Sequence, residues 1–402
     1  MLSENALDNL MQPIIDRQEA ISNYVVKIIA QRVKEIGHLL PSDVYKLERL
    51  LKTGADVRKI NKTLAKMTGL QERDIKKLIK QVAEDSYLDT RPYFDYRQKP
   101  FIPFEENKAL QNVVKAVSAA TLDTYKNLCK AQAFMIRDLK NPKVLKPTKI
   151  AKTYQSVIDE AIQAVQGGVL DYNTAMRRTM KQLADSGIRS VTYHPESGRT
   201  YTQRLDTAVR RNLMDGIRAI NQGVQDEVGK QYGADGKEIT VHAMSAPDHE
   251  PIQGHQFTNE EYDKLQNGEA FEDVDGEKFA PIARPIGMWN CRHFKYSIII
   301  GVNKPNFTKK QLEQMKKENA KGYTDKSGHH FTKYECTQKM REMETDIRRH
   351  KERYLALVES GDNEGAKAER ATITQLTRNY KAFCNACGLN PQATRARVIG
   401  YK

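Results

Sequence analysis

The sequence predicts a mainly α-helical protein with a small α+β domain in its middle and an αα-hairpin near its C-terminal end. Three observations support this fold class. Apolar residues recur near the helical period through most of residues 1–235. Turn dipeptides and alternating residues replace that pattern in residues 235–303. Two heptad stripes then follow in residues 336–387.

The composition is typical of helices that bury one stripe and leave broad solvated faces. The chain has 402 residues, of which 39% are hydrophobic and 29% charged. This length exceeds a single hydrophobic core and predicts several domains. We expect an N-terminal helical region at 1–104, a second helical region at 105–234, a small β-containing module at 235–303 (the middle module) and a basic helical hairpin region at 304–402.

The first two regions are expected to be almost entirely helical. An opening helix ends around Gly37, and two short amphipathic helices at 57–67 and 72–83 follow, separated by a turn at 68–70. A linker rich in proline and aromatic residues is expected at 87–103, lying against an apolar surface. Further helices are expected at about 105–139, 153–166, 172–186 and 202–231.

The middle module is expected to be the only β-rich part of the chain. Asp235-Gly236 and Asp275-Gly276 are typical of hairpin turns. Residues 238–243 and 294–300 have the composition of strands.

The C-terminal region predicts two antiparallel helices joined by a short polar loop. Two stripes of residues step alternately by three and four positions. They are Cys336, Met340, Met343, Ile347, His350, Tyr354 and Leu357, then Ala366, Glu369, Ile373, Leu376, Tyr380, Phe383 and Cys387. Because the polar His350 and Glu369 interrupt the seam, we expect a partner surface to complete it.

The positive charge indicates a polyanionic neighbour. The net charge is +14, and residues 303–402 hold 21 Lys and Arg against 12 Asp and Glu. Such a surplus favours DNA bound without sequence specificity, or an acidic protein surface, and a merely solubilising charge is the alternative. Arg348, Arg349 and Lys351 are the candidate DNA contacts in this region.

Cysteine usage and apolar runs indicate a protein made in the cytoplasm, without membrane contact. The five cysteines are odd in number and have no disulfide-framework spacing. The N-terminal residues lack the layout of a signal peptide, and no apolar run is long enough to cross a bilayer. Cys384 and Cys387 form a lone C-x-x-C pair, for which packing within the hairpin is favoured over metal binding.

A helix-turn-helix motif is a further hypothesis for residues 57–83. Ala65, Gly69 and Ile75 have its spacing of small, turn and branched residues. The basic residues around them that could face DNA are Lys62, Lys66, Arg73, Lys76, Lys77 and Lys80. Any tight corner between two helices also requires glycine, so an ordinary αα-corner is the alternative.

The middle module also concentrates side chains that can bind metal. If residues 291–293 enter a strand, Cys291 and His293 lie on the same face and could chelate an ion together. His249, with His242 or His255, could complete a tetrahedral nitrogen and sulfur site, with zinc as the candidate metal. The spacing matches no zinc finger, so ordinary hydrogen bonds in a small core are the alternative.

The residues of this module resemble the signature of the phage minor head proteins, the head-morphogenesis family that includes the Mu F-type proteins. The similar residues are Ser245-Ala246-Pro247-Asp248-His249, Ile252-Gln253-Gly254, Gly287 and Asn290-Cys291-Arg292-His293. The helical N-terminal half, the turn at 322–324 and the helix at 334–354 also resemble the branch called minor capsid protein 2. The motif ends here on His293 where the family also has cysteine, which keeps a ligand type but weakens an argument from a cysteine pair.

The resemblance implies a minor structural protein of a tailed-phage head, present in few copies inside the capsid near the portal. It implies roles in head assembly or in genome packaging and ejection, with portal, major capsid or scaffolding protein as partners. Neither a phosphate-binding loop nor a G-x-S-x-G elbow is present, so no catalytic residue is assigned. The alternatives are a metal-dependent nuclease or other hydrolase built on His249, His255, Cys291 and His293, and a helix-turn-helix regulator.

Overall fold

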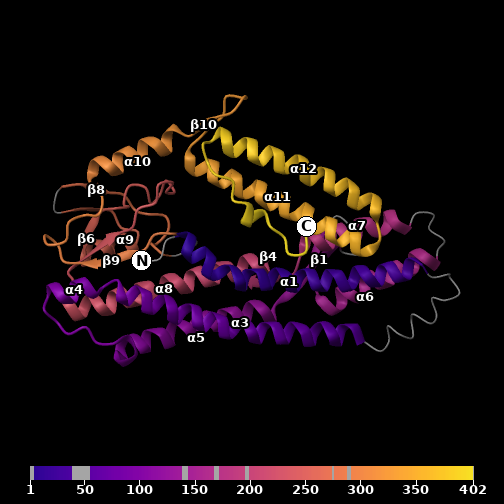
Figure 1. The fold of residues 1–402 in the computed structure, drawn as a ribbon, viewed down its shortest axis with the longest axis horizontal. Helices are drawn as coiled ribbons and strands as arrows, with labels where there is room; N and C mark the ends of the chain where they lie inside the picture. The colour runs from indigo at the N-terminus through magenta and orange to yellow at the C-terminus, as the bar shows by residue number, and fades with distance from the viewer. Residues whose placement is uncertain are drawn as a thin grey trace. The chain divides into compact units, whose positions relative to one another are not determined.

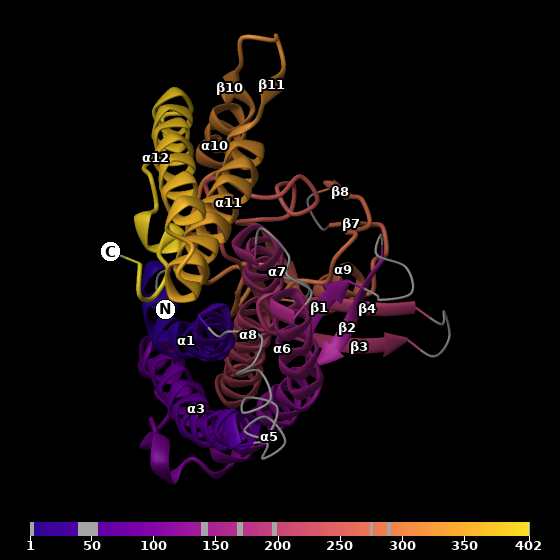
Figure 2. The same ribbon diagram turned by 90° about the vertical axis from the view of Figure 1, so that its right-hand side faces the viewer.

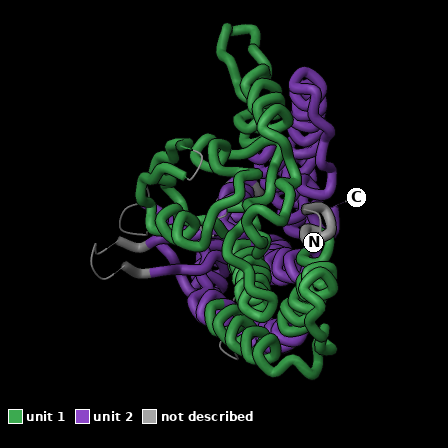
Figure 3. The backbone as a smooth tube through the Cα atoms, turned by 90° about the vertical axis from the view of Figure 1, so that its left-hand side faces the viewer, with its two compact units in different colours: residues 1–11, 74–124, 211–339 green, residues 12–73, 125–210, 340–402 purple. Residues whose placement is uncertain are grey.

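A computed structural model describes residues 4–38, 55–137, 144–166, 172–194, 199–273, 276–287 and 291–401. This part of the chain is mainly helical and carries small antiparallel sheets, which confirms the predicted fold class (Figure 1). The chain divides into two compact units, coloured in Figure 3. Unit 1 comprises Met1–Met11, Asp74–Thr124 and Arg211–Lys339, and unit 2 comprises Gln12–Arg73, Tyr125–Arg210 and Met340–Lys402.

Long helices form most of the structure. They are α1 (Glu4–Gly37), α3 (Ala55–Leu88), α5 (Lys108–Lys130), α8 (Leu205–Tyr232) and α11 (Lys333–Ser360). The boundaries between the two units fall within these five helices. The predicted end of the opening helix at Gly37 is confirmed, and its buried face includes Ile21, Val25 and Ile29.

The predicted turn at 68–70 is wrong, and with it the helix-turn-helix hypothesis. Residues 55–88 form the single helix α3, which continues through Gly69. Gly69 is exposed, and a Cβ atom added there would meet no atom within 4 Å. A solvent-exposed glycine inside a helix costs about 1 kcal/mol, which the packing of the rest of the helix can offset.

A four-stranded sheet occupies part of the region expected to be helical. The strands are β1 (Gln132–Arg137), β2 (Leu145–Lys149), β3 (Arg189–His194) and β4 (Arg199–Arg204), antiparallel in the order β2-β1-β3-β4. The predicted helix at 105–139 therefore ends at Lys130, and the middle module is not the only β-rich part. Strands β3 and β4 are rich in threonine and tyrosine, which favour a half-buried sheet without giving an apolar period. Helices α6 (Ile150–Gln166) and α7 (Tyr172–Ser186) lie between β2 and β3 in the chain (Figure 2).

The predicted linker at 87–103 lies on an aromatic cluster of unit 1, although part of it is helical. It contains the short helix α4 (Arg91–Tyr96) and leads to a 3-10 turn at Phe104–Glu106. The Tyr93 and Phe94 rings contact Tyr232 of helix α8, with ring centroids 5.2 and 5.9 Å apart. This packing confirms the apolar contact expected for the segment.

The middle module holds a three-stranded antiparallel sheet of order β6-β5-β9, formed by β5 (Gly236–Ile239), β6 (Gln256–Thr258) and β9 (Lys295–Ile298). The predicted turn at Asp235-Gly236 is wrong, because Gly236 begins β5 and pairs with Thr258 and Ile298. The short hairpin of β7 (Phe271–Glu272) and β8 (Lys278–Phe279) matches the second predicted turn, whose Asp275 lies outside the described residues. Helix α9 (Asn259–Gln266) supplies Tyr262 and Leu265 to the core of the module.

After the middle module, helix α10 (Lys309–Lys321) leads to a hairpin of β10 (Tyr323–Thr324) and β11 (His330–Phe331). Helices α11 and α12 (Asn363–Ala386) then lie side by side and confirm the αα-hairpin (Figure 1). The two polar residues of the seam pair with each other within unit 2, because His350 Nδ1 lies 2.6 Å from Glu369 Oε2. Lys181 of α7 forms an ion pair of 2.6 Å with the other carboxylate oxygen of Glu369.

One buried carboxyl group of unit 2 makes the stability depend on pH. Glu19 of α1 is 6% exposed, and its Oε1 accepts the backbone N–H of Ile399 at 3.0 Å. Burial, reinforced by the nearby carboxylate of Glu352, raises the pKa of Glu19 from 4.5 to about 7. Since the folded pKa is above the unfolded one, the stabilising contribution is complete below pH 4.5 and is lost as the pH rises through 7.

We expect Glu19→Gln to stabilise the protein at pH 8 relative to wild type, and to do so far less at pH 5. The amide keeps an acceptor for Ile399 but has no charge to desolvate, so the difference between the two pH values should reach about 2–3 kcal/mol. Denaturant unfolding at both pH values measures it. Glu364→Gln is the matched control, because the Glu364 side chain is 93% exposed. An equal effect of Glu19→Gln at pH 5 and pH 8 would contradict the buried, protonatable carboxyl group.

Candidate metal centre

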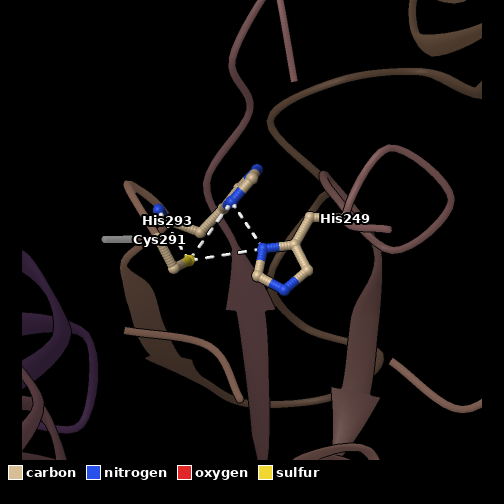
Figure 4. A group of neighbouring side chains, drawn as sticks. All are labelled: His249, Cys291 and His293. Atoms are coloured by element: carbon tan, nitrogen blue, oxygen red, sulfur yellow. Dashed lines mark hydrogen bonds between the residues drawn. The ribbon is translucent and has the colours of Figure 1, made fainter. Parts of the chain in front are cut away.

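Three buried side chains of the middle module converge on one point (Figure 4). His249 Nδ1 lies 3.3 Å from His293 Nδ1 and 3.3 Å from Cys291 Sγ. The distance from Cys291 Sγ to His293 Nδ1 is 3.6 Å. His249, Cys291 and His293 are 0%, 2% and 4% exposed, so the cluster is closed to bulk water.

The backbone around β5 and β9 places these ligands. Cys291 and His293 immediately precede β9, and Phe294 exchanges hydrogen bonds with Thr240 just beyond β5. Residues 291–293 do not enter the strand as expected, because β9 begins at Lys295, but the side chains of Cys291 and His293 still lie together. His249 comes from a turn in which its N–H donates to the carbonyl of Ala246 at 3.0 Å.

Hydrogen bonds on the outer edge of each imidazole fix its orientation. His249 Nε2 lies 2.8 Å from the carbonyl oxygen of Arg284. Since a carbonyl only accepts, Nε2 carries the proton and Nδ1 presents its lone pair to the cluster. His293 Nε2 lies 3.4 Å from Gln253 Oε1, which also accepts the N–H of His242 at 2.8 Å. Ser245 Oγ lies 3.5 Å from the same Nε2. With Gln253 Oε1 as the acceptor, Nε2 carries the proton and Nδ1 presents its lone pair inward.

The sulfur atom lies among donors that favour a thiolate. The backbone N–H groups of Gly287 and His293 both donate to Cys291 Sγ, the latter at 3.3 Å. Burial alone would raise the pKa of the Cys291 thiol, but His249 and these N–H groups lower it below the ordinary value. Burial likewise opposes protonation of His249, yet its hydrogen bond to Cys291 raises the pKa of this imidazole.

His293 stays neutral, as a metal ligand must. Burial, followed by the charges of His242 and His249, lowers the pKa of His293 to about 2. The His242 ring lies edge-on to His293 with centroids 4.6 Å apart, and its own Nε2 lies 2.9 Å from the carbonyl of Arg292. His242 thus packs against the cluster without directing a ring nitrogen into it.

An ion pair between Asp248 and Arg284 fixes the position of the turn that carries His249. The Arg284 guanidinium donates two hydrogen bonds of 2.8 Å to the Asp248 carboxylate, which lowers the pKa of Asp248. The carbonyl of the same arginine accepts from His249. The spacing of residues along the chain indicates no role for Arg284 or Gln253, because their contacts come from the fold.

The structure separates His255 from the predicted ligand set. Its ring meets Phe279 edge-on at 5.2 Å and stacks on Phe257 at 6.1 Å, and burial lowers its pKa. His255 is therefore part of the aromatic core of the module, and the cluster contains His249, Cys291 and His293. Of the remaining motif residues, Arg292 offers its carbonyl to His242, and Asn290 lies outside the described residues.

The candidate DNA-contacting residues differ in how far internal contacts already occupy their charged groups. Lys66, Arg73, Lys76, Lys77 and Lys80 are all exposed on α3, and Lys80 pairs with Glu105 at 2.8 Å. On α11, Arg348 lies 3.7 Å from Asp206, and Lys351 donates to the carbonyl of Ala396 at 2.7 Å. Arg349 is exposed and forms an ion pair of 2.9 Å with Asp346. Internal contacts thus occupy much of the positive charge of α11.

Comparison with known proteins supplies one match. The sequence profile of the family described as phage minor capsid protein 2 matches residues 2–385. No curated protein and no solved structure matches the chain. Among the helices in the described part of the chain, none combines the length and apolar character that a membrane span requires.

We expect Gly254→Ala to unfold the middle module more readily than an ordinary glycine substitution would. Gly254 has φ +73°, and a Cβ atom there would lie 2.7 Å from Leu312 Cδ2 and 2.9 Å from Val241 Cγ2. Strain and overpacking together should cost about 2–4 kcal/mol. Gly268→Ala is the control, since it has φ +71° but no atom nearer than 3.7 Å. Thermal unfolding of both variants measures the difference, and equal losses would show that the close approach has no effect.

Proposed function

Because the chain belongs to the phage minor capsid protein 2 family, we propose that it acts inside the head of a tailed phage, in few copies near the portal. The match over residues 2–385 is the observation that carries the proposal, since it covers both compact units. Membership makes the protein a structural component of the phage virion. Its proposed tasks are head assembly and the packaging and ejection of the genome.

The proposed partners are the portal protein, the major capsid or scaffolding protein, and packaged DNA. The net charge of +14 supports an anionic neighbour. The exposed basic residues of α3 are better placed for phosphate contacts than Arg348 and Lys351, whose charges are engaged internally. Contacts of this kind carry no sequence information, so DNA binding should be non-specific and weaken with salt.

A hydrolase is the second candidate function, because three protein ligands leave a fourth position for water, as in catalytic zinc sites. The surroundings favour the structural role. The cluster is almost completely buried, and the neighbouring Asp248 carboxylate is held by both nitrogens of the Arg284 fork. The hydrogen bond from Arg284 lowers the pKa of Asp248, which makes this carboxylate a weaker general base.

Wild-type protein incubated with duplex and single-stranded DNA and with zinc, manganese or magnesium should leave the DNA intact. Gel electrophoresis of the products measures this. Cleavage that disappears in His249→Ala but persists in His255→Ala would establish the hydrolase in place of the structural role.

The proposed location predicts the composition of purified particles. Quantitative mass spectrometry should find the protein in heads at a small fraction of the major capsid protein. It should be missing from isolated tails. Comparing gradient-separated empty and full heads then tests whether it stays in the capsid or leaves with DNA.

The major capsid protein and a tail-tube protein serve as internal standards for the two fractions. Detection only as free protein in the lysate, with none in washed particles, would contradict a place in the virion. Detection in heads at the copy number of the major capsid protein would contradict the minor role.

A further inference from the structure

We propose that His249 Nδ1, Cys291 Sγ and His293 Nδ1 bind one zinc ion that fastens the middle module. The proposal is independent of the partner and location proposed above. It rests on the distances, the orientation of the rings and the burial of the three side chains.

The distances match the edges of a zinc coordination tetrahedron. Zinc lies about 2.0 Å from imidazole nitrogen and about 2.3 Å from thiolate sulfur. In a tetrahedron these lengths separate two nitrogens by about 3.3 Å, and a nitrogen and the sulfur by about 3.5 Å. The structure has 3.3 Å between the Nδ1 atoms of His249 and His293, and 3.3 and 3.6 Å from these nitrogens to Cys291 Sγ. One ion at the centre can therefore reach all three atoms without rearrangement of the backbone.

With these ring orientations, the cluster holds too few protons to pair with both of the imidazole lone pairs at its centre. Arg284 and Gln253 accept from the Nε2 atoms of His249 and His293, so two lone pairs face each other across 3.3 Å. A single thiol proton can satisfy one nitrogen but leaves the other lone pair unpaired in a buried site. A divalent cation satisfies both nitrogens and the sulfur at once, and the thiol proton is released to solvent when it binds.

The outer contacts have the form that protein metal sites require. Ligating histidines usually donate their second ring nitrogen to a carbonyl or carboxylate, which fixes the tautomer and aims the lone pair. His249 has such a partner in the Arg284 carbonyl, and His293 has one in the Gln253 side chain. The N–H groups of Gly287 and His293 donate to the sulfur. Two imidazoles and a thiolate select zinc over magnesium or calcium, which prefer oxygen ligands.

A bound ion would stabilise the middle module, which has little regular secondary structure of its own. Strands β5 and β9 have four residues each and β6 has three. The ligands join the turn that carries His249 to the start of β9, across 42 residues. Among the described residues, no fourth His, Cys, Asp or Glu side chain joins the three. Binding would then contribute directly to the folding free energy of the module.

Elemental analysis of untagged full-length protein, purified without chelator, tests the proposal. We expect close to one zinc per chain, retained on gel filtration and lost in Cys291→Ala and in His249→Ala. His255→Ala is the matched histidine control, and Cys384→Ala removes a buried cysteine outside the cluster. Both controls should keep their zinc. A folded wild-type protein without zinc, or zinc retained by Cys291→Ala, would overturn the proposal.

Cobalt substitution of the wild-type protein decides the question even if the ligand variants fail to fold. Cobalt in this site should give a sulfur-to-metal charge-transfer band and intense visible bands typical of tetrahedral coordination. The band should persist in Cys129→Ala, Cys336→Ala, Cys384→Ala and Cys387→Ala, which leaves Cys291 as the source of the sulfur. A wild-type protein that takes up cobalt without the charge-transfer band, or that loses the band in Cys384→Ala, would overturn the assignment.

Discussion

The convergence of two imidazole nitrogens and one sulfur at His249, Cys291 and His293 is the constraint on which the rest of the middle module depends. The segments that carry these ligands have little regular structure of their own. The turn with His249 is tied to the Arg284 segment through both the side chain and the carbonyl of that arginine. The apolar core beneath the ligands is small, so a bound ion would add a substantial part of the folding free energy. In the proposed metal site, His249, Cys291 and His293 are the ligands, and Arg284 orients His249.

Buried ion pairs are the second organising feature, and unit 2 contains several of them. Arg204 donates two hydrogen bonds of 2.6 and 2.7 Å to Glu352, and Arg177 is paired with Asp362 at the start of α12. Burying paired charges rarely adds stability relative to an apolar contact, but an unpaired one is costly. Such pairs therefore penalise alternative helix registers. His350 and Glu369 follow the same principle, because the apparent defect in the heptad seam is a satisfied hydrogen bond.

The sequence predicted what depends on a strong helical period. The end of α1, the helices α6, α7 and α8, and the α11–α12 hairpin follow from the spacing of apolar residues. The sheet of β1 to β4 was not predicted, because its strands are short and its threonine and tyrosine residues show no apolar alternation. Gly69 was interpreted as a turn because local propensity alone favours one, whereas tertiary packing keeps α3 continuous. Residue types pointed to the candidate ligands His249, Cys291 and His293, but only the fold separates them from His255 and adds Arg284 and Gln253.

The central proposal is that this member of the phage minor capsid protein 2 family binds an ion through His249, Cys291 and His293. Anomalous diffraction at the zinc absorption edge, from crystals of the full-length protein grown without chelator, tests this claim most directly. The account predicts one strong anomalous peak, at bonding distance from His249 Nδ1, Cys291 Sγ and His293 Nδ1. An ordered middle module with no peak among these three atoms would contradict it.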